Sequence, residues 1–288
     1  MRTAFVFGAP RSGTTYLMEI LDASARTECL SGHLMPVGLV HLFAQDPPPV
    51  ERELVGRMFR LAVSDYLHSG LYHSRSSAFR KAAVSRTPSR LRDALTGLRY
   101  AEVFVYKEPM IAFAPHLVYD AFPDAPIIYI YRDGRDVAAS LQRSYDVLSD
   151  ATLASLESNE TMLGRRVRDI YVPWWVEAGD DEEFLSASAY VRAIWMWREM
   201  VKRSDAFFAE VESPARVLRV RYEELVREPT RVGAQIASHV GVPLTTWMKS
   251  KLRAASPRSI GAHSAFDSSE IAAAERVAGD ELARLGYL

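Results

Sequence analysis

The first seventeen residues constrain the fold of this chain more than any other stretch. Residues 4–7 are an apolar run that predicts a short buried strand. Residues 8–13 follow as a glycine-containing turn, and an amphipathic helix is expected from Thr14 onward. Backbone N–H groups converge where such a loop meets a helix N-terminus, and the helix dipole favours negative charge there. The sequence therefore predicts an anion-binding loop between its first strand and its first helix.

This loop departs from the common nucleotide-binding pattern at one position. Its spacing matches G-x-x-x-x-G-K-[ST], except that Thr14 stands where the lysine is expected. That lysine reaches the β- and γ-phosphates of a nucleoside triphosphate, and its nearest substitute here is Arg11, inside the loop. We therefore expect a phosphate-like ligand other than ATP or GTP. The alternative is a turn that enters a Rossmann-like helix and binds no ligand.

Strand and helix patterns alternate along the rest of the chain. Strands are expected at 27–30, 103–106, 125–131 and 217–222. Helices are expected at 37–70 with a break at the prolines of 46–49, and at 112–122, 188–210, 231–240 and up to Leu285. The run 125–131 is apolar at nearly every position, as in a parallel strand that is covered on both faces. The patterns predict a three-layer α/β domain with a P-loop-like central parallel sheet flanked by helices.

Composition excludes several classes of protein. The 35 Lys and Arg residues nearly balance the 36 Asp and Glu residues, so no overall field favours nucleic acid or a membrane surface. A single cysteine, Cys29, excludes an internal disulfide and a cysteine metal cluster, and it suits a reducing cytoplasm. No run reaches the roughly 18 apolar residues of a transmembrane helix, and the first apolar run is too short for a signal peptide. We expect one soluble, cytoplasmic domain over 1–288, without a membrane span or a nucleic-acid partner.

Basic residues stand at three of the predicted strand ends. Arg11 lies in the first loop, Lys107 follows the strand at 103–106, and Arg132 follows the strand at 125–131. Ligands of open α/β sheets bind beyond the carboxyl ends of the strands. We therefore expect the three residues to converge on one polyanionic ligand.

With these motifs the sequence resembles the sulfotransferases that use 3′-phosphoadenosine 5′-phosphosulfate (PAPS). Residues 8–15, Gly-Ala-Pro-Arg-Ser-Gly-Thr-Thr, look like the family's 5′-phosphosulfate loop, and residues 131–140, Tyr-Arg-Asp-Gly-Arg-Asp-Val-Ala-Ala-Ser, look like its 3′-phosphate motif. Residues 222–229, followed by Val-Gly-Val-Pro at 240–243, are similar to its late strand–helix segment, whose tyrosine lies near the adenine. The forms Lys-Glu-Pro and Pro-Arg-Ser-Gly-Thr-Thr resemble protein-tyrosine and bacterial sulfotransferases more than the cytosolic aryl enzymes.

The resemblance implies a donor site for PAPS, with adenosine 3′,5′-bisphosphate as the product and no metal. Arg132 would meet the 3′-phosphate with its guanidinium and Ser140 with its hydroxyl. These two converge only if Arg132 lies at the strand end and the chain folds back; otherwise Arg132 merely pairs with Asp133 or Asp136. Residues 258 and 259 lie where related enzymes bring a C-terminal loop over the nucleotide, although Ser-Pro-Arg-Ser is equally an ordinary turn. The expected donor-binding residues are Arg11, Ser12, Gly13, Thr14, Thr15, Tyr16, Arg132, Ser140, Tyr222, Arg258 and Ser259.

The resemblance also suggests catalytic residues. Lys107, at the family's Lys-x-Pro position, and Arg11 would stabilise the negative charge that develops during sulfuryl transfer. The general base has two candidates. His33 lies in the segment where the family commonly places an acidic residue, and Glu108 lies where the aryl enzymes carry a histidine. The alternatives are a packed His33 and an ordinary exposed Lys107 that ends a strand.

These features predict an enzyme of class EC 2.8.2 that moves a sulfuryl group from PAPS to an acceptor hydroxyl by in-line transfer with a general base. A P-loop nucleotide kinase is one alternative, but Arg132 ends the strongest strand where a magnesium-binding acidic residue would be expected. A non-catalytic nucleotide-binding module is another. Peptide tyrosine, a lipid or sugar hydroxyl and a secondary metabolite all remain possible acceptors, and the lack of an anchor favours a small molecule or secondary metabolite. A homodimer is possible.

The acceptor side is expected in two insertions, at about 37–100 and 146–185, which carry no recognisable motif. The stretch 74–99 within the first is rich in Arg and Ser and reads as a solvated surface. Aromatic side chains in the insertions either line an apolar opening or belong to the core; they are Tyr72, His73, Tyr171, Trp174 and Trp175.

Overall fold

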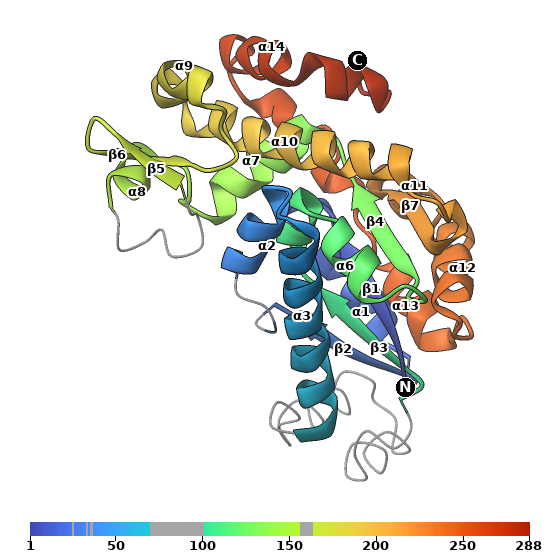
Figure 1. The fold of residues 1–288 in the computed structure, drawn as a ribbon. Helices are drawn as coiled ribbons and strands as arrows, with labels where there is room; N and C mark the ends of the chain where they lie inside the picture. The colour runs from blue at the N-terminus through green and yellow to red at the C-terminus, as the bar shows by residue number, and fades with distance from the viewer. Residues whose placement is uncertain (25, 33, 35–36, 70–100, 156–163) are drawn as a thin grey trace.

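A central parallel sheet organises the computed structural model, which describes residues 1–24, 26–32, 34, 37–69, 101–155 and 164–288. Its strand order is β2-β3-β1-β4-β7, and every neighbouring pair is parallel (Figure 1). The strands are β1 (Arg2–Phe7), β2 (Thr27–Ser31), β3 (Val103–Lys107), β4 (Ile127–Tyr131) and β7 (Val217–Arg221). The predicted α/β class with a central parallel sheet is confirmed.

Helices cover both faces of this sheet. One face packs against α1 (Thr14–Asp22), α11 (Tyr222–Arg227), α12 (Pro229–Val240) and α13 (Thr246–Arg253). The opposite face packs against α2 (Val37–Ala44), α3 (Pro49–Ser69), α6 (His116–Ala121), α7 (Gly134–Ser144) and α10 (Ala189–Glu210). The last helix, α14 (Ser268–Arg284), packs on α10 and α7. In β4 the residues Ile127 and Ile128 alternate between the two cores, which explains why the strand is apolar at successive positions.

The strand register brings the carboxyl ends of β2, β3 and β1 together. Lys107 of β3 lies opposite Ser31 on one side and Val6 on the other. The backbone N–H of Glu108 donates to the carbonyl of Val6 at 3.3 Å, and the N–H of Gly32 donates to the carbonyl of Lys107 at 2.9 Å. The segments that follow these strands therefore start side by side at one edge of the sheet.

The prediction of a helix over 112–122 is wrong for the first half of that range. Residues Pro109–Phe113 form a 3-10 turn (η2), and α6 begins only at His116. Ala114 between them has φ −147° and ψ 64°, because a residue that precedes a proline is pushed out of the helical region. The break expected near residues 46–49 is confirmed, and α3 begins at Pro49.

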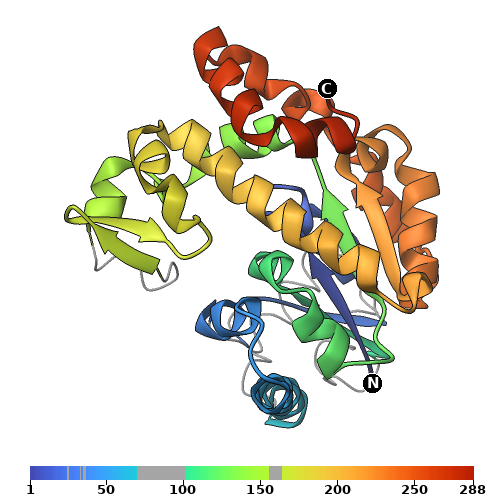
Figure 2. The same cartoon turned by 45° about the horizontal axis from the view of Figure 1, so that its top comes forward.

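The second insertion contains a small antiparallel hairpin of β5 (Gly164–Val167) and β6 (Ile170–Pro173). Its turn residues Arg168 and Asp169 both have positive φ, 48° and 68°, as a two-residue hairpin turn requires. The hairpin lies beside α8 (Asp150–Ala154) and α9 (Asp181–Ser186), away from the central sheet (Figure 2).

The remaining C-terminal connections are short. They are η3 (Ala178–Asp180), η4 (Pro214–Arg216), η5 (Pro257–Ser259) and η6 (Ala262–Ala265). In the part of the chain that the structure describes, no helix combines the length and the apolar character that crossing a membrane would require.

Candidate functional site

The loop between β1 and α1 is held against β4 and Tyr222 by two glycines. Gly8 has φ 151°, and a Cβ atom there would lie 2.0 Å from the carbonyl oxygen of Ile130. Gly13 has φ 100°, and its Cβ would lie 2.5 Å from Cδ2 of Tyr222. A side chain at either position would require both strained backbone and displacement of a neighbour. The two glycines therefore fix the path of the loop.

The N-terminus of α1 is open to an anion. Gly13 caps the helix without a side-chain hydrogen bond, and the first turn contains no acidic residue. Beside it, the hydroxyl of Ser12 is buried and has no hydrogen-bond partner among the described residues. Thr14 is buried at the start of the helix, whereas Thr15 is exposed. Unpaired N–H groups and a buried hydroxyl without a carboxylate nearby fit a phosphate or sulfate group.

Tyr16 directs its side chain elsewhere. Its hydroxyl donates to the carbonyl oxygens of Lys251 and Leu252 in α13, at 3.2 and 3.1 Å. Burial, with smaller effects of Tyr222 and Glu19, raises the pKa of Tyr16 to about 12. The neutral hydroxyl thus fastens α1 to α13, and only the backbone N–H of Tyr16 is left to face a ligand.

Arg11 reaches from the loop to α7. It has φ 68°, its Nε donates to the hydroxyl of Ser140 at 3.0 Å, and its guanidinium lies 5.6 Å from the ring centre of the exposed Tyr145. Among the described residues it forms no ion pair with a carboxylate. The charge of Arg11 is therefore not neutralised within this part of the protein.

Arg132 is the buried centre of the site. Only 4% of its surface is exposed, although it lies in the connection between β4 and α7. Nη1 donates to the carbonyl of Arg11 at 3.3 Å, Nη2 donates to the carbonyl of Ser259, and the guanidinium stacks 4.7 Å from the ring centre of Tyr222. Its Nε–H has no partner in the described structure. A buried donor without a partner costs free energy unless a ligand satisfies it.

Arg132 also forms an ion pair, with Asp136 at 3.5 Å. Arg132 can therefore pair with Asp136 and still offer its Nε–H to a ligand. Arg132 lies directly after β4, and Arg132 and Ser140 both contact Arg11, one through the Arg11 carbonyl and the other through its Nε.

The other charged residues of the 131–140 segment support the fold. Asp133 caps α7 by accepting the N–H of Arg135 at 2.9 Å, and the Arg135 side chain pairs with both Asp133 and Glu275. The N–H of Asp133 donates to the buried carboxylate of Glu223 at 3.1 Å. These contacts join β4, α7, α11 and α14 behind Arg132.

The C-terminal loop of residues 256–264 lies against the same site. The hydroxyls of Tyr222 and Ser259 are 3.1 Å apart, and the Ser259 carbonyl accepts from Arg132. The Arg258 side chain is exposed. The structure thus brings Ser259 to Arg132 and Tyr222, whereas Arg258 lies at the surface of the loop.

Asp136 and His263 join this loop to α7. The sequence analysis named Asp136 only as a possible partner of Arg132, and it missed His263. The carboxylate of Asp136 accepts hydrogen bonds from the N–H groups of Gly261 and His263 and from Nδ1 of His263. The signal available for Asp136 was an acidic residue four positions after Arg132 in a segment expected to be helical. Nothing in the local sequence points to His263.

Lys107 and Glu108 lie on the other side of the loop, at the end of β3. Burial lowers the pKa of Lys107, and the charge of Glu108 opposes part of this shift. Lys107 is half-buried and forms no ion pair within the described residues. Glu108 caps η2, since its Oε1 accepts the N–H of Met110 at 3.1 Å. Its Oε2 would be 3.7 Å from a Cβ on Gly32, so the carboxylate faces the segment after β2.

Several expected acceptor-side residues lie outside the described residues, namely His33, Tyr72, His73 and the stretch 74–99. Tyr171 and Trp175 are buried at 8% and 1% exposure and belong to the core. Trp174 is partly exposed and packs against Phe113 and His41. Of the named aromatic residues that the structure describes, Trp174 alone is left to line an opening.

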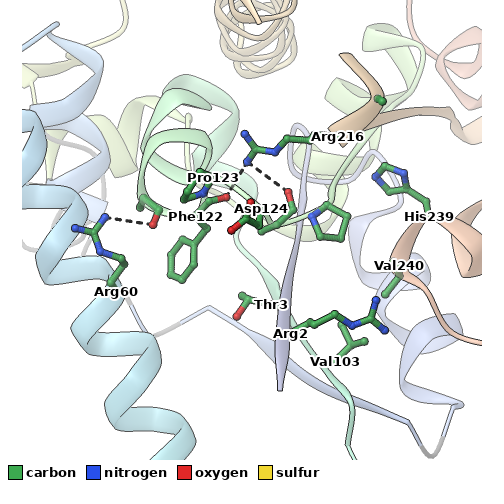
Figure 3. Close-up of a pocket in the computed structure, with 14 residues that line it drawn as sticks. Arg2, Thr3, Arg60, Val103, Phe122, Pro123, Asp124, Arg216, His239 and Val240 are labelled. Carbon is green, nitrogen blue, oxygen red and sulfur yellow. Dashed lines mark hydrogen bonds between the residues drawn. The ribbon is translucent and has the colours of Figure 1, made fainter. Parts of the chain in front are cut away.

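A separate pocket of about 630 Å³ lies at the opposite, amino-terminal edge of the sheet (Figure 3). The side chains of its three arginines donate hydrogen bonds to backbone carbonyls at or just after the ends of neighbouring helices. Arg60 donates to Ala121, Arg216 to Phe122 and Ala125, and Arg2 to Gly241. Because these donors satisfy helix ends, the pocket has a structural explanation and is distinct from the loop site.

Comparison with solved structures places the fold among sulfotransferases. The sulfotransferase domain of the curacin biosynthetic pathway is 15% identical, covers 100% of this chain and 99% of that domain, and has a TM-score of 0.50. Sulfotransferase STF9 of Mycobacterium avium is 18% identical over 100% of this chain and 77% of that one, with a TM-score of 0.49. The sulfotransferase domain of the Synechococcus PCC 7002 olefin synthase is 17% identical over 96% and 87%, with a TM-score of 0.47.

Sequence comparison identifies the family. No curated protein sequence matches the chain. A family model described as the sulfotransferase family matches residues 4–185, which is more than half of the chain and includes the loop site, Lys107 and Arg132. The chain therefore belongs to the sulfotransferase family and is an enzyme of class EC 2.8.2.

Proposed function

We propose that this enzyme transfers a sulfuryl group from PAPS to a hydroxyl of a small-molecule acceptor, with a secondary metabolite as the favoured class. The observation that carries the donor assignment is the buried Arg132, whose Nε–H has no partner in the described structure beside an open helix N-terminus. A polyanion with phosphate groups at two positions satisfies both features.

The proposed contacts to PAPS form two groups, one at each phosphate-bearing end of the donor. The N–H groups of the loop and of Thr14, Thr15 and Tyr16 bind the 5′-phosphosulfate end, together with the Ser12 hydroxyl. Arg132 and Ser140 bind the 3′-phosphate, and Tyr222 with residues 258–259 borders the nucleotide. The glycines at 8 and 13 leave no space for a Cβ beside Ile130 and Tyr222, which fixes the path of the loop and with it the direction of its N–H groups.

PAPS supplies the activated sulfuryl group and a good leaving group. Lys107 and Arg11 hold two cationic charges on either side of the loop, where negative charge increases during transfer. Both are free of carboxylate ion pairs among the described residues, so their charges remain available to the reacting group. Ser140 fixes the guanidinium of Arg11 through its hydrogen bond.

The general base that takes the acceptor proton is His33 or Glu108. Glu108 follows Lys107 directly, and its Oε2 faces Gly32, the neighbour of His33 in the sequence. Glu108 therefore belongs to the β2–β3 side of the site, and this supports an acceptor that binds on that side. The insertions at 37–100 and 146–185 would enclose it within the single domain of 1–288.

Transfer of labelled sulfate from PAPS to a panel of hydroxyl compounds tests this proposal. We expect product with a subset of phenols or alcohols, and no transfer of phosphate from labelled ATP. Phosphate transfer, or the absence of any sulfated product across peptides, lipids, sugars and metabolites, would contradict it.

Two substitutions then separate the candidate bases. His33→Ala is expected to lower kcat by about 10²-fold or more, the usual contribution of a general base, while Glu108→Gln retains most activity. Both variants should bind adenosine 3′,5′-bisphosphate like the unaltered enzyme, since the proposed base acts on the acceptor hydroxyl and not on the nucleotide. The opposite order of the two kcat values would assign the base to Glu108.

A further inference from the structure

Asp136 is a buried carboxylate whose hydrogen bonds go to a single loop. Its side chain is 1% exposed within α7. Oδ2 accepts the N–H of Gly261 at 2.8 Å, and Oδ1 accepts both the N–H and Nδ1–H of His263 at 3.0 and 2.8 Å. All three donors belong to the C-terminal loop of residues 256–264. This carboxylate therefore anchors residues 261–263 of the loop to α7.

The same carboxylate faces the Arg132 guanidinium. Oδ2 of Asp136 lies 3.5 Å from Nη2 of Arg132, and Nη2 also donates to the carbonyl of Ser259 in the loop. The Asp136 carboxylate and the Ser259 carbonyl thus both contact Nη2 of Arg132. Loss of the carboxylate would release the loop and remove the charge that orients Arg132 at the same time.

The carboxylate is held in its ionised form. Burial alone would raise the pKa of Asp136, but the hydrogen bonds of His263 and Gly261 and the charge of Arg132 together hold that pKa below its ordinary value. A buried ionised carboxylate is costly unless it is fully hydrogen-bonded and paired, as it is here. Asp136 therefore contributes a fixed negative charge at neutral pH.

The loop contacts the donor half of the site. Its second point of attachment is the hydroxyl pair of Ser259 and Tyr222, and Tyr222 stacks on Arg132. Lys107 ends β3 and Glu108 follows it, and β3 is separated from β4 by β1 in the sheet. A change in the loop position should therefore alter donor binding more than acceptor binding.

We propose that Asp136 and His263 are positioning residues for the donor. They hold the C-terminal loop and Arg132 in the arrangement that binds the 3′-phosphate end of PAPS, without contacting the reacting atoms. The inference rests on the proposed function, and it assigns a role to two residues outside the donor-binding set.

Titration calorimetry with adenosine 3′,5′-bisphosphate tests the pair through Asp136→Asn and His263→Ala. We expect each to raise Kd about tenfold, corresponding to about 1.4 kcal/mol. Steady-state kinetics should show a higher KM for PAPS, with kcat at saturating PAPS and KM for the acceptor within about twofold of the unaltered enzyme. His263→Asn retains a donor near the Nδ1 position and should recover most of the affinity.

Ser264→Ala is the matched control in the same loop. Its exposed hydroxyl donates to Gly261 and touches neither Asp136 nor Arg132, so Kd should not change. The inference would be overturned if Asp136→Asn and His263→Ala both lowered thermal stability but left Kd and the KM for PAPS unchanged. The contact between the two residues would then be purely structural. If the unaltered enzyme does not bind adenosine 3′,5′-bisphosphate, the proposed function itself fails and the inference fails with it.

Discussion

At the scale of single residues, the two proposed catalytic cations, Arg11 and Lys107, differ in how readily their charge can be removed. Guanidinium groups do not lose their proton in proteins, whereas lysine ammonium groups can. Lys107 is half-buried, and burial lowers its pKa. Its charge is thus the one that a change of pH can remove.

The pH dependence of kcat should reveal the loss of the Lys107 proton. In the proposed mechanism the charged form of Lys107 stabilises the transition state, so activity is present below the lowered pKa and is lost as pH rises through it. We expect kcat to decline at a pH below the ordinary lysine value of about 10.4. Lys107→Arg should keep part of the activity and lose this alkaline decline, whereas Lys107→Met should lower kcat by about 100-fold or more. An unchanged alkaline decline in Lys107→Arg would assign the titration to another group.

At the scale of elements, the strand ends could be predicted because apolar runs and the residues after them are local features. Lys107 and Arg132 follow such runs directly, and the structure places both at the carboxyl edge of the sheet. The 164–173 hairpin was missed because its turn is Arg168-Asp169, which lacks the glycine or asparagine that marks such turns. The helix expected at 112–122 was wrong because Pro115 restricts the residue before it.

Gly13→Ala tests how tightly the first loop fits between its neighbours. A Cβ would meet the Tyr222 ring at 2.5 Å, and the backbone has φ 100°, which alanine adopts only with strain. We expect the free energy of unfolding to fall by about 2 kcal/mol, measured by urea denaturation. Donor affinity should fall as well, because a displaced Tyr222 no longer stacks on Arg132.

Gly279→Ala is the matched control for that substitution. Gly279 lies in α14 with nothing within 4 Å of its Cβ position, so the substitution should leave stability unchanged or raise it by about 0.5 kcal/mol. Equal effects of the two substitutions would show that the loop tolerates a side chain at Gly13.

At the scale of the whole molecule, the site depends on contacts between distant parts of the chain. Arg11 and Ser140 are 129 positions apart, and Asp136 and His263 are 127 positions apart. No local pattern contains such pairs, which is why the sequence predicted the motif residues but not the network that positions them. The C-terminus adds a further long-range contact through Tyr287.

Tyr287→Phe should measure the contribution of this C-terminal contact. The Tyr287 hydroxyl donates to the buried carboxylate of Glu223 at 2.9 Å, and burial raises the pKa of Tyr287, so the hydroxyl remains a donor. Removing it leaves the carboxylate with fewer partners, and we expect a loss of about 1–2 kcal/mol in urea denaturation. The neighbouring Leu288→Ala, at a 59% exposed position, should have no measurable effect. An equal loss in both variants would locate the effect in the chain end and not in the hydrogen bond.

The central claim is that the loop and Arg132 bind a 3′-phosphorylated nucleotide and not a nucleoside triphosphate. Titration calorimetry of the enzyme with adenosine 3′,5′-bisphosphate and, separately, with ATP and magnesium tests it most directly. We predict tight binding of the bisphosphate and weak binding of ATP, with Arg132→Lys losing at least about tenfold in affinity for the bisphosphate because a bidentate guanidinium is replaced by a point charge. Tighter binding of ATP, or no binding of either nucleotide, would contradict the account.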